Sequence, residues 1–446
     1  MLKNIRTLAL LSFFFAATVP QVAQALCGGQ GSFLTQKVKS QGAIIGQNWG
    51  VDFQAVNNAP FFVVLSFAPA QFIFPGIGEV CVDPNQMLVA GQGITSATGQ
   101  GSVALPIPND PTLLNITLFA QVLVFDASAP NGFSISQRII SPLSSLSSPL
   151  SHPTLVGARD LTLTQNNLAY FNPASSTVFD VNAALGVSSK YSRPGGLGMA
   201  AANFASGFNA FFIGSSNSNL YWDYDYGDTA NTLSSICDPF DFGSASGSFT
   251  NSIVKVAFNH ANRRVLLSDL ISGQILKFTI DLTPDCSSGA SELSALVYPS
   301  TVTALTGINT PRLKKMAGTY LTNDFFFWDE TSDFILRGDT NSQNFAAVVL
   351  SRNDILAFTG ANDVIVKTLS TDSLGNLFFY DSVSQQMIQR NAQGELATLF
   401  SYAQLQHAVS PGNPLVLEES QFDPRTTGGG LTILENLSGK IVDVRF

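Results

Sequence analysis

Histidine is the side chain through which many enzymes move protons, and this chain has only three histidines, His152, His260 and His407. No two of them stand at the short spacing of a metal-binding pair, and no G-x-S-x-G segment accompanies them as a nucleophile elbow would. His152 lies in a stretch rich in serine and proline, and His260, within FNHAN, is predicted to cap a turn before a strand. The sequence therefore identifies no catalytic residue.

The best candidates for ligand binding stand in YWDYDY (221–226), where aromatic and acidic residues alternate. In a strand, this alternation would place Trp222, Tyr224 and Tyr226 on one face and Tyr221 with the two aspartates on the other. On an exposed face the rings could stack on a sugar or on a partner surface. On a buried face they would be ordinary core packing. We select Tyr221, Trp222, Tyr224 and Tyr226 as the predicted binding residues.

Four cysteines are present, Cys27, Cys81, Cys237 and Cys286, and no two are closer than 49 residues. That spacing lacks the C-x-x-C pairs of a structural zinc site. An even number of cysteines favours disulfides in an exported protein. We predict bonds from Cys27 to Cys81 and from Cys237 to Cys286, because pairing within each predicted domain leaves the segment between the domains unconstrained.

The last two thirds of the chain are predicted to consist of one repeated hairpin, clearest in GNLFFYDSVSQQMIQR (375–390). A turn leads into a short apolar strand, an acid opens a polar turn, and a second strand returns antiparallel. The polar residue after the apolar run marks each copy: Asn172, Ser215, Asp269, Asp329, Asp381 and Glu435. These landmark residues are 43 to 60 residues apart, a period typical of propeller blades. The alternative, a plain β-sandwich of hairpins, has no reason to repeat at this length.

These copies resemble the NHL and YVTN-type propeller repeats, in which a strand ending in an acid is followed by a polar turn and a second strand. DLISGQILK (269–277) and DSVSQQMIQR (381–390) match best, whereas Asn172 and Ser215 stand where the acid would be. The resemblance covers about residues 155–446. It implies a six-bladed β-propeller.

A six-bladed propeller can also be an enzyme. Those of the gluconolactonase and paraoxonase kind hydrolyse lactones or esters with a divalent ion in the central channel, held by Glu, Asn and Asp side chains, a donor set that suits calcium. In this chain residues 155–251 include several aspartates and no glutamate, so the early glutamate of such enzymes has no counterpart. Asp238 and Asp241 could instead form a calcium site in a loop. We predict no metal and no cofactor, with calcium as the alternative.

Residues 26–140 show short alternating strands without a sustained helical period, which predicts an antiparallel β-sandwich. The segments IPNDPTL (107–113), LFAQV (118–122) with Asp126, and GFSIS (132–136) resemble a small module of exported proteins from environmental bacteria, over about residues 43–140. The resemblance implies an accessory role in structure or attachment. Residues 141–153, SPLSSLSSPLSHP, are predicted to form an extended linker between the domains or a strap over the surface.

The first 25 residues are predicted to be a secretory signal, because Lys3 and Arg6 precede a short apolar stretch and a small-x-small site at 23–25. Removing these two cations changes the formal charge from −9 to −11. An acidic chain in which only 12% of residues are charged and no basic cluster occurs is a poor partner for nucleic acid, and no later stretch is long enough for a transmembrane helix.

The sequence thus predicts an exported, two-domain, all-β protein: signal peptide 1–25, β-sandwich 26–140, linker 141–153 and six-bladed propeller 154–446. The predicted function is non-catalytic binding or scaffolding at a propeller face, with an extracellular protein or glycan as partner, in the secreted, periplasmic or cell-surface space. The alternative is a calcium-dependent lactonase or esterase. Acidic and amide oxygens converging on the propeller axis would favour the enzyme, and a plugged channel would favour binding.

Overall fold

The computed structural model describes residues 38–74, 78–129, 132–163, 167–182, 184–192, 196–203, 209–215, 219–223, 233–248, 251–280, 293–423 and 429–446. The chain divides into two compact units, Met1–Leu143 with Gln393–Thr398, and Ser144–Ala392 with Leu399–Phe446. We call the second the propeller unit, for the reason given below. Among the described residues no helix is long and apolar enough to cross a membrane.

The first unit is built from antiparallel strands. One sheet contains β1 (Val38–Ser40), β3 (Asn48–Gln54) and β8 (Gln100–Pro106), and another contains β4 (Pro60–Ser66), β7 (Leu88–Ile94), β9 (Thr117–Phe125) and β10 (Phe133–Ile135). Shorter pieces are β2 (Ala43–Ile44), the hairpin of β5 (Pro69–Phe74) and β6 (Gly78–Val82), and the 3₁₀ turn η2 (Pro111–Leu113). Alternate residues of β3, such as Trp49 and Val51, share one core with Val63 of β4 and Val122 of β9, so the alternation in the sequence is the pattern of core contact.

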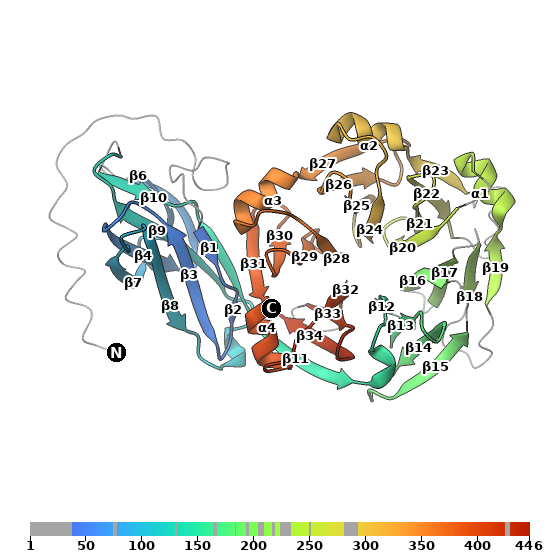
Figure 1. The fold of residues 1–446 in the computed structure, drawn as a ribbon, viewed down its shortest axis with the longest axis horizontal. Helices are drawn as coiled ribbons and strands as arrows, with labels where there is room; N and C mark the ends of the chain where they lie inside the picture. Colours follow the sequence, from blue (N-terminus) through green and yellow to red (C-terminus); the bar gives the residue numbers. More distant parts are fainter. Residues whose placement is uncertain are drawn as a thin grey trace. The chain divides into compact units, whose positions relative to one another are not determined.

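The propeller unit contains five four-stranded antiparallel sheets that follow one another along the chain (Figure 1). They are β12 (Asp160–Leu163), β13 (Leu168–Asn172), β14 (Thr177–Val181) and β15 (Val187–Ser192); β16 (Gly196–Asn203), β17 (Asn209–Ser215), β18 (Leu220–Asp223) and β19 (Ser234–Cys237); β20 (Ile253–Asn259), β21 (Arg264–Asp269), β22 (Gln274–Thr279) and β23 (Ser294–Val297); β24 (Leu313–Gly318), β25 (Asp324–Asp329), β26 (Phe334–Asp339) and β27 (Ala346–Leu350); β28 (Val366–Thr371), β29 (Leu377–Asp381), β30 (Gln386–Arg390) and β31 (Leu396–Ser401).

A further set consists of β32 (Leu417–Phe422), β33 (Gly430–Glu435), β34 (Lys440–Arg445) and the second half of β11 (Ile139–Ser151). We call it the closing sheet. The first strands of successive sheets contact one another in the order β12, β16, β20, β24, β28 and β32, and β32 contacts β12 again. Sheets arranged in a ring around their inner strands form a β-propeller (Figure 1).

The landmark residues of the sequence repeat are the last residues of the second strand in each sheet. Asp269, Asp329, Asp381 and Glu435 are fully buried, yet each carboxylate accepts hydrogen bonds from backbone N–H groups. Asp381, for example, accepts from Ile365 at 2.9 Å, just before β28, and from Ser384 at 2.9 Å, in the turn after β29. The acid therefore fastens the turn between the second and third strands to the entry of the first strand. This is a structural role.

Asn172 occupies the same position in the first sheet. Before the first strand its side chain donates hydrogen bonds, whereas the landmark acids accept them there. Its Nδ2 donates to the carbonyl oxygens of Thr154 at 2.7 Å and Val156 at 3.0 Å, while its Oδ1 accepts from the turn N–H of Ala174 at 2.9 Å. An amide can do both, whereas a carboxylate only accepts. Asn172 therefore occupies the landmark position of the first sheet.

In the part of the chain that the structure describes, four short α-helices follow the outer strands of four sheets, and the sequence analysis did not anticipate them: α1 (Pro239–Ser246), α2 (Pro299–Thr306), α3 (Arg352–Thr359) and α4 (Tyr402–Val409). In α3, Ser351 and Asp354 form a reciprocal capping box at the start, and Gly360, with φ of 68°, ends the helix in the left-handed region. Asp238 and Asp241 form the equivalent capping box of α1. Their carboxylates thus cap a helix, and the loop calcium site predicted there is not supported.

The predicted linker is a strand. Ile139–Pro142 of β11 pair with β9, and residues 145–151 pair with β34 as the outer strand of the closing sheet. We predicted that serine and proline would prevent a strand ladder here, and that was wrong for a positional reason. Pro149 lies in the register shift between Ser147 and Leu150, where no regular ladder bond is required of it. The 3₁₀ turn η3 (Pro153–Leu155) follows, capped by His152.

Two of the four cysteines lie within the described residues. Cys81 is buried beside Ile135 in the first unit, and Cys237 is buried in the core between the second and third sheets. Neither is a free thiol. Cys27 and Cys286 lie outside the described residues, so the pairing stays a prediction.

Candidate functional site

The inner strands place four charged residues and one threonine at equivalent positions around the propeller axis. Asp160, Lys255, Lys315, Thr368 and Glu419 each pair with the residue that precedes the landmark of their own sheet. Equal register puts their side chains on equivalent faces of their strands. We call these five residues the axial layer.

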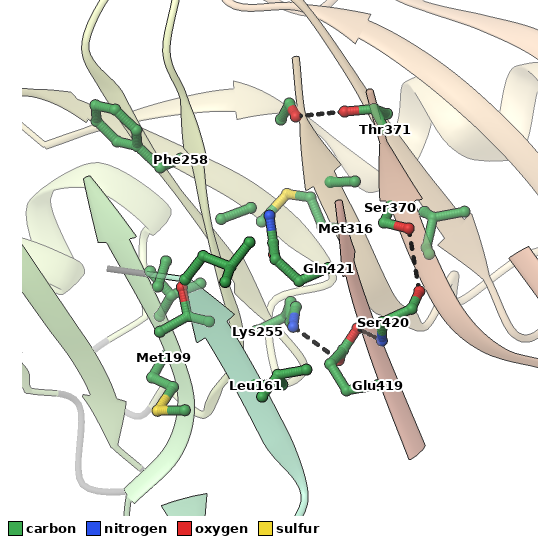
Figure 2. Close-up of a pocket in the computed structure, with 18 of the residues that line it drawn as sticks. Leu161, Met199, Lys255, Phe258, Met316, Ser370, Thr371, Glu419, Ser420 and Gln421 are labelled. Carbon is green, nitrogen blue, oxygen red and sulfur yellow. Dashed lines mark hydrogen bonds and ion pairs between the residues drawn. The ribbon is translucent and has the colours of Figure 1, made fainter. Parts of the chain in front are cut away.

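Within this layer Lys255 joins three sheets. Its ammonium Nζ lies 2.7 Å from Asp160 Oδ1 in β12 and 2.8 Å from Glu419 Oε2 in β32, and Figure 2 shows the bond to Glu419. Lys315 Nζ lies 3.4 Å from the same Glu419 oxygen and donates to the backbone carbonyl of Glu418 at 3.0 Å. Asp160 also accepts from Met199 N at 2.8 Å. The buried charges are therefore paired and hydrogen-bonded, as burial requires.

The protonation of this network follows from its surroundings. Burial alone would lower the pKa of Lys255, but the carboxylates of Asp160 and Glu419 outweigh it and raise that pKa. Burial pushes the pKa of Glu419 upward, and Lys255 with Lys315 more than reverse this and lower it. For Asp160 burial dominates and raises the pKa, with Lys255 offsetting part of the effect. Lys255 is thus a cation and Glu419 an anion at neutral pH.

A narrow cavity of about 50 Å³ runs along the inner strands from Lys255 and Glu419 (Figure 2). That volume holds a few water molecules, far less than the several hundred Å³ of a typical small-molecule pocket. Its walls carry neutral hydrogen-bonding groups. Ser370 Oγ and Ser420 Oγ are 3.1 Å apart, and Thr371 Oγ1 donates to the Gly318 carbonyl at 2.8 Å. The two charged side chains of the lining, Lys255 and Glu419, are ion-paired with each other.

The cavity ends where the first strands turn into the second strands. His260, just after β20, stacks on Tyr320, just after β24, with ring centroids 4.3 Å apart and planes 6° from parallel. At the same end Leu321 is 73% exposed and Leu374 is 76% exposed. We call these four residues the mouth. The landmark turns lie at the opposite end of the propeller, because the second strands run antiparallel to the first.

Only part of the predicted binding stretch can be placed. Trp222, in β18, stacks on Phe212 with centroids 6.2 Å apart and packs against the core, while Tyr221 is half-buried. Asp223 is buried and accepts a hydrogen bond from the Tyr191 hydroxyl. Tyr224 and Tyr226 lie outside the described residues. Core packing is thus observed for Trp222, and a binding role for the stretch stays a prediction.

The three histidines have different structural roles. His152 Nδ1 accepts from Thr154 N at 3.3 Å as a turn cap, and His407 lies in the last turn of α4. His260 lies in the turn between β20 and β21, as predicted, and its backbone N–H donates to the Thr319 carbonyl at 3.0 Å. Its position at the mouth was not predicted.

A calcium ion in the channel would need six to eight oxygen ligands. In the described part of the chain no three His, Cys, Asp or Glu side chains gather so as to hold a metal. The two carboxylates near the axis, Asp160 and Glu419, already share the ammonium of Lys255. The residues present do not fit calcium at this position.

Sequence reasoning missed the axial layer, although a signal was present. Lys255 stands alone in the apolar strand IVKVAFN (253–259), and a lysine in a buried strand needs a partner. What the sequence could not show is which carboxylates supply it.

The chain matches no protein-family model and no curated protein. Among solved structures it is similar to a protein of unknown function from Bacteroides thetaiotaomicron, at 10% identity over 93% of this chain and 99% of that chain, with a TM-score of 0.45. It is also similar to virginiamycin B lyase from Staphylococcus aureus, at 10% identity over 74% and 92% of the chains, with a TM-score of 0.41. A third is a luciferin-regenerating enzyme, at 8% identity over 68% and 95%, with a TM-score of 0.43. Scores at this level carry no argument about activity.

Proposed function

We propose that this chain is an exported, non-catalytic binding protein: a six-bladed propeller preceded by an accessory β-sandwich, which recognises a neutral, hydroxyl-rich ligand such as the end of a glycan. The observation that carries the proposal is the set of hydroxyl groups in the axial cavity beside the mouth; because the cavity has only about 50 Å³, the sugar ring itself would lie at the mouth. The cavity's charged lining residues Lys255 and Glu419 are ion-paired with each other. Among its apolar wall residues stand the hydroxyls of Ser370, Thr371 and Ser420 and the amide of Gln421, which both donate and accept hydrogen bonds. Such groups suit sugar hydroxyls and do not activate a nucleophile.

The mouth is the proposed recognition end. Its stacked His260 and Tyr320 and its exposed leucines offer flat and apolar surface beside the polar cavity, a combination found in ligand pockets. β18 runs in the same direction as the inner strand β16, so Asp223, its last residue, lies at the mouth end. The predicted binding residues Tyr224 and Tyr226 follow directly in the sequence.

The calcium-dependent hydrolase has no comparable support, because Lys255 occupies the space between the two axial carboxylates. Export, both disulfides and an attachment role for the first unit are parts of the same proposal. They agree with the apolar stretch after Lys3 and Arg6, the four cysteines and the net negative charge.

The test compares the two ends of the propeller on an array of neutral oligosaccharides. Tyr320→Ala and Leu374→Ser change the mouth, and Ile271→Ser and Leu437→Ser are matched controls, because both side chains are exposed in turns at the opposite end. Binding is expected for the native protein and for the controls, and reduced binding for the mouth variants. Equal loss at both ends, no binding to any oligosaccharide, or calcium-dependent hydrolysis of a lactone or aryl ester by the native protein would contradict the proposal.

A further inference from the structure

Lys255 connects parts of the propeller that are far apart in the chain. It lies in β20 of the third sheet, while Asp160 begins the first sheet and Glu419 lies in the closing sheet. β12 and β32, which carry these two carboxylates, are in contact where the ring closes. One ammonium therefore holds the first and last sheets to the sheet across the ring.

The packing around Lys255 is tight. A Cβ atom added at Gly198 of β16 would lie 2.8 Å from the Lys255 Cα and 3.0 Å from its backbone nitrogen. Glycine at this point therefore allows β16 to approach β20 closely, and a side chain there would displace the strand that carries the lysine. The position of the ammonium is thus fixed by backbone packing as well as by its ion pairs.

Without Lys255, the buried Asp160 would lose the ion pair that neutralises it, and Glu419 would keep Lys315 as its cation. The carboxylate oxygens of the two acids converge on one atom at 2.7 and 2.8 Å, slightly longer than calcium–oxygen bonds of about 2.3 to 2.6 Å. Of these two acids, Lys315 forms an ion pair with Glu419, at 3.4 Å. Asp160 and Glu419 thus form a binding position for a cation, and the ammonium of Lys255 is that cation.

We infer that Lys255 is the resident cation of the propeller axis: its ammonium takes the place that a divalent metal ion would occupy between Asp160 and Glu419, and its removal creates a divalent-cation site that the native protein lacks. This inference concerns ring closure, and it goes beyond the proposed binding function. It requires that the stability of the native protein be independent of divalent ions and that the loss of Lys255 make stability dependent on them.

The experiment measures thermal unfolding of four proteins, each with chelator and with millimolar calcium chloride. They are the native chain, Lys255→Ala, Lys255→Met as a control that fills the space, and a neutral variant with Lys255→Met, Asp160→Asn and Glu419→Gln. The melting temperature of the native protein is expected to be the same in chelator as in calcium, and so is that of the neutral variant. Lys255→Ala is expected to melt several degrees lower in chelator and to recover in calcium, with a smaller recovery for Lys255→Met. Calorimetric titration should show calcium binding to Lys255→Ala alone or most strongly.

The inference is overturned if calcium stabilises the native protein, or if Lys255→Ala shows no response to calcium. It is overturned equally if calcium stabilises the neutral variant as much as Lys255→Ala, since the effect would then arise elsewhere. If Lys255→Ala does not fold in chelator, it should fold when refolded in calcium, and failure in both buffers also counts against the inference.

Discussion

Replacing Asp381 by alanine should destabilise the propeller by about 3 kcal/mol. The fully buried carboxylate accepts backbone N–H groups from Ile365 at 2.9 Å, Val383 at 3.3 Å and Ser384 at 2.9 Å. A hydrogen bond to a charged group contributes about 1.5 to 3 kcal/mol, and a buried N–H left without an acceptor costs about 1 to 3 kcal/mol. Ile365 and Val383 are partly exposed, so water can replace part of the loss, and the total stays well below the sum of three bonds.

Asparagine at position 381 should cost much less, about 1 kcal/mol. Its single carbonyl oxygen can keep the bonds to Ile365 and Val383, which both go to Oδ1, and only the bond from Ser384 to Oδ2 is lost. The first sheet already uses Asn172 at this position. Urea unfolding gives the free energies, and hydrogen exchange of β28, β29 and β30 shows whether the loss is local. Ser382→Ala, in the same turn, is the control.

An alanine variant within about 1 kcal/mol of the native protein, or an asparagine variant as unstable as the alanine variant, would contradict this prediction. The first result would mean that water fully replaces the carboxylate. The second would mean that the negative charge, and not the geometry of the acceptor, stabilises the turn.

Three further predictions concern Lys255, Thr368 and residues 145–151. The pKa of Lys255 is raised above 10.5 in the folded protein, so its stabilising effect should be complete below about pH 10.5 and should fade above it. The difference in unfolding free energy between the native protein and Lys255→Met should therefore shrink as the pH rises above that value. A difference that stays constant would contradict this prediction. Thr368→Val should leave stability unchanged or raise it by about 1 kcal/mol, because the buried Thr368 hydroxyl has no partner among the described residues, and a clear loss in urea unfolding would show that water or a ligand satisfies it. Limited proteolysis should spare residues 145–151, which pair with β34, and early cleavage there, mapped by mass spectrometry, would argue that this strand detaches.

Much of the repeat could be predicted because its determinants are local. The apolar run before Asp329 and the turn after it lie within a few residues, and the structure confirms that the landmarks end the second strands. The helices also left a local signal that the sequence analysis overlooked. Ser351 and Asp354 stand three residues apart, and Gly360 follows at the helix end, the spacing of a capping box and a left-handed cap.

The role of residues 141–153 could not be predicted, because it depends on a partner almost three hundred residues away. Serine and proline give this segment no periodicity of its own, and it becomes a strand only because β34 offers an unpaired edge. Strand formation is decided by the neighbour as much as by the sequence of the strand.

Hydrophobic alternation and turn residues act over a few positions, so the amino-acid sequence was enough to predict the all-β class, the hairpin repeat and the landmark acids. The residues that meet at the axis could be identified only in the folded chain. Lys255 and Asp160 are 95 residues apart, and Lys255 and Glu419 are 164 apart, so no local pattern relates them. Closing the ring brings the three side chains together, and burial then makes their pairing obligatory, because an unpaired charge in the interior costs far more than the network does.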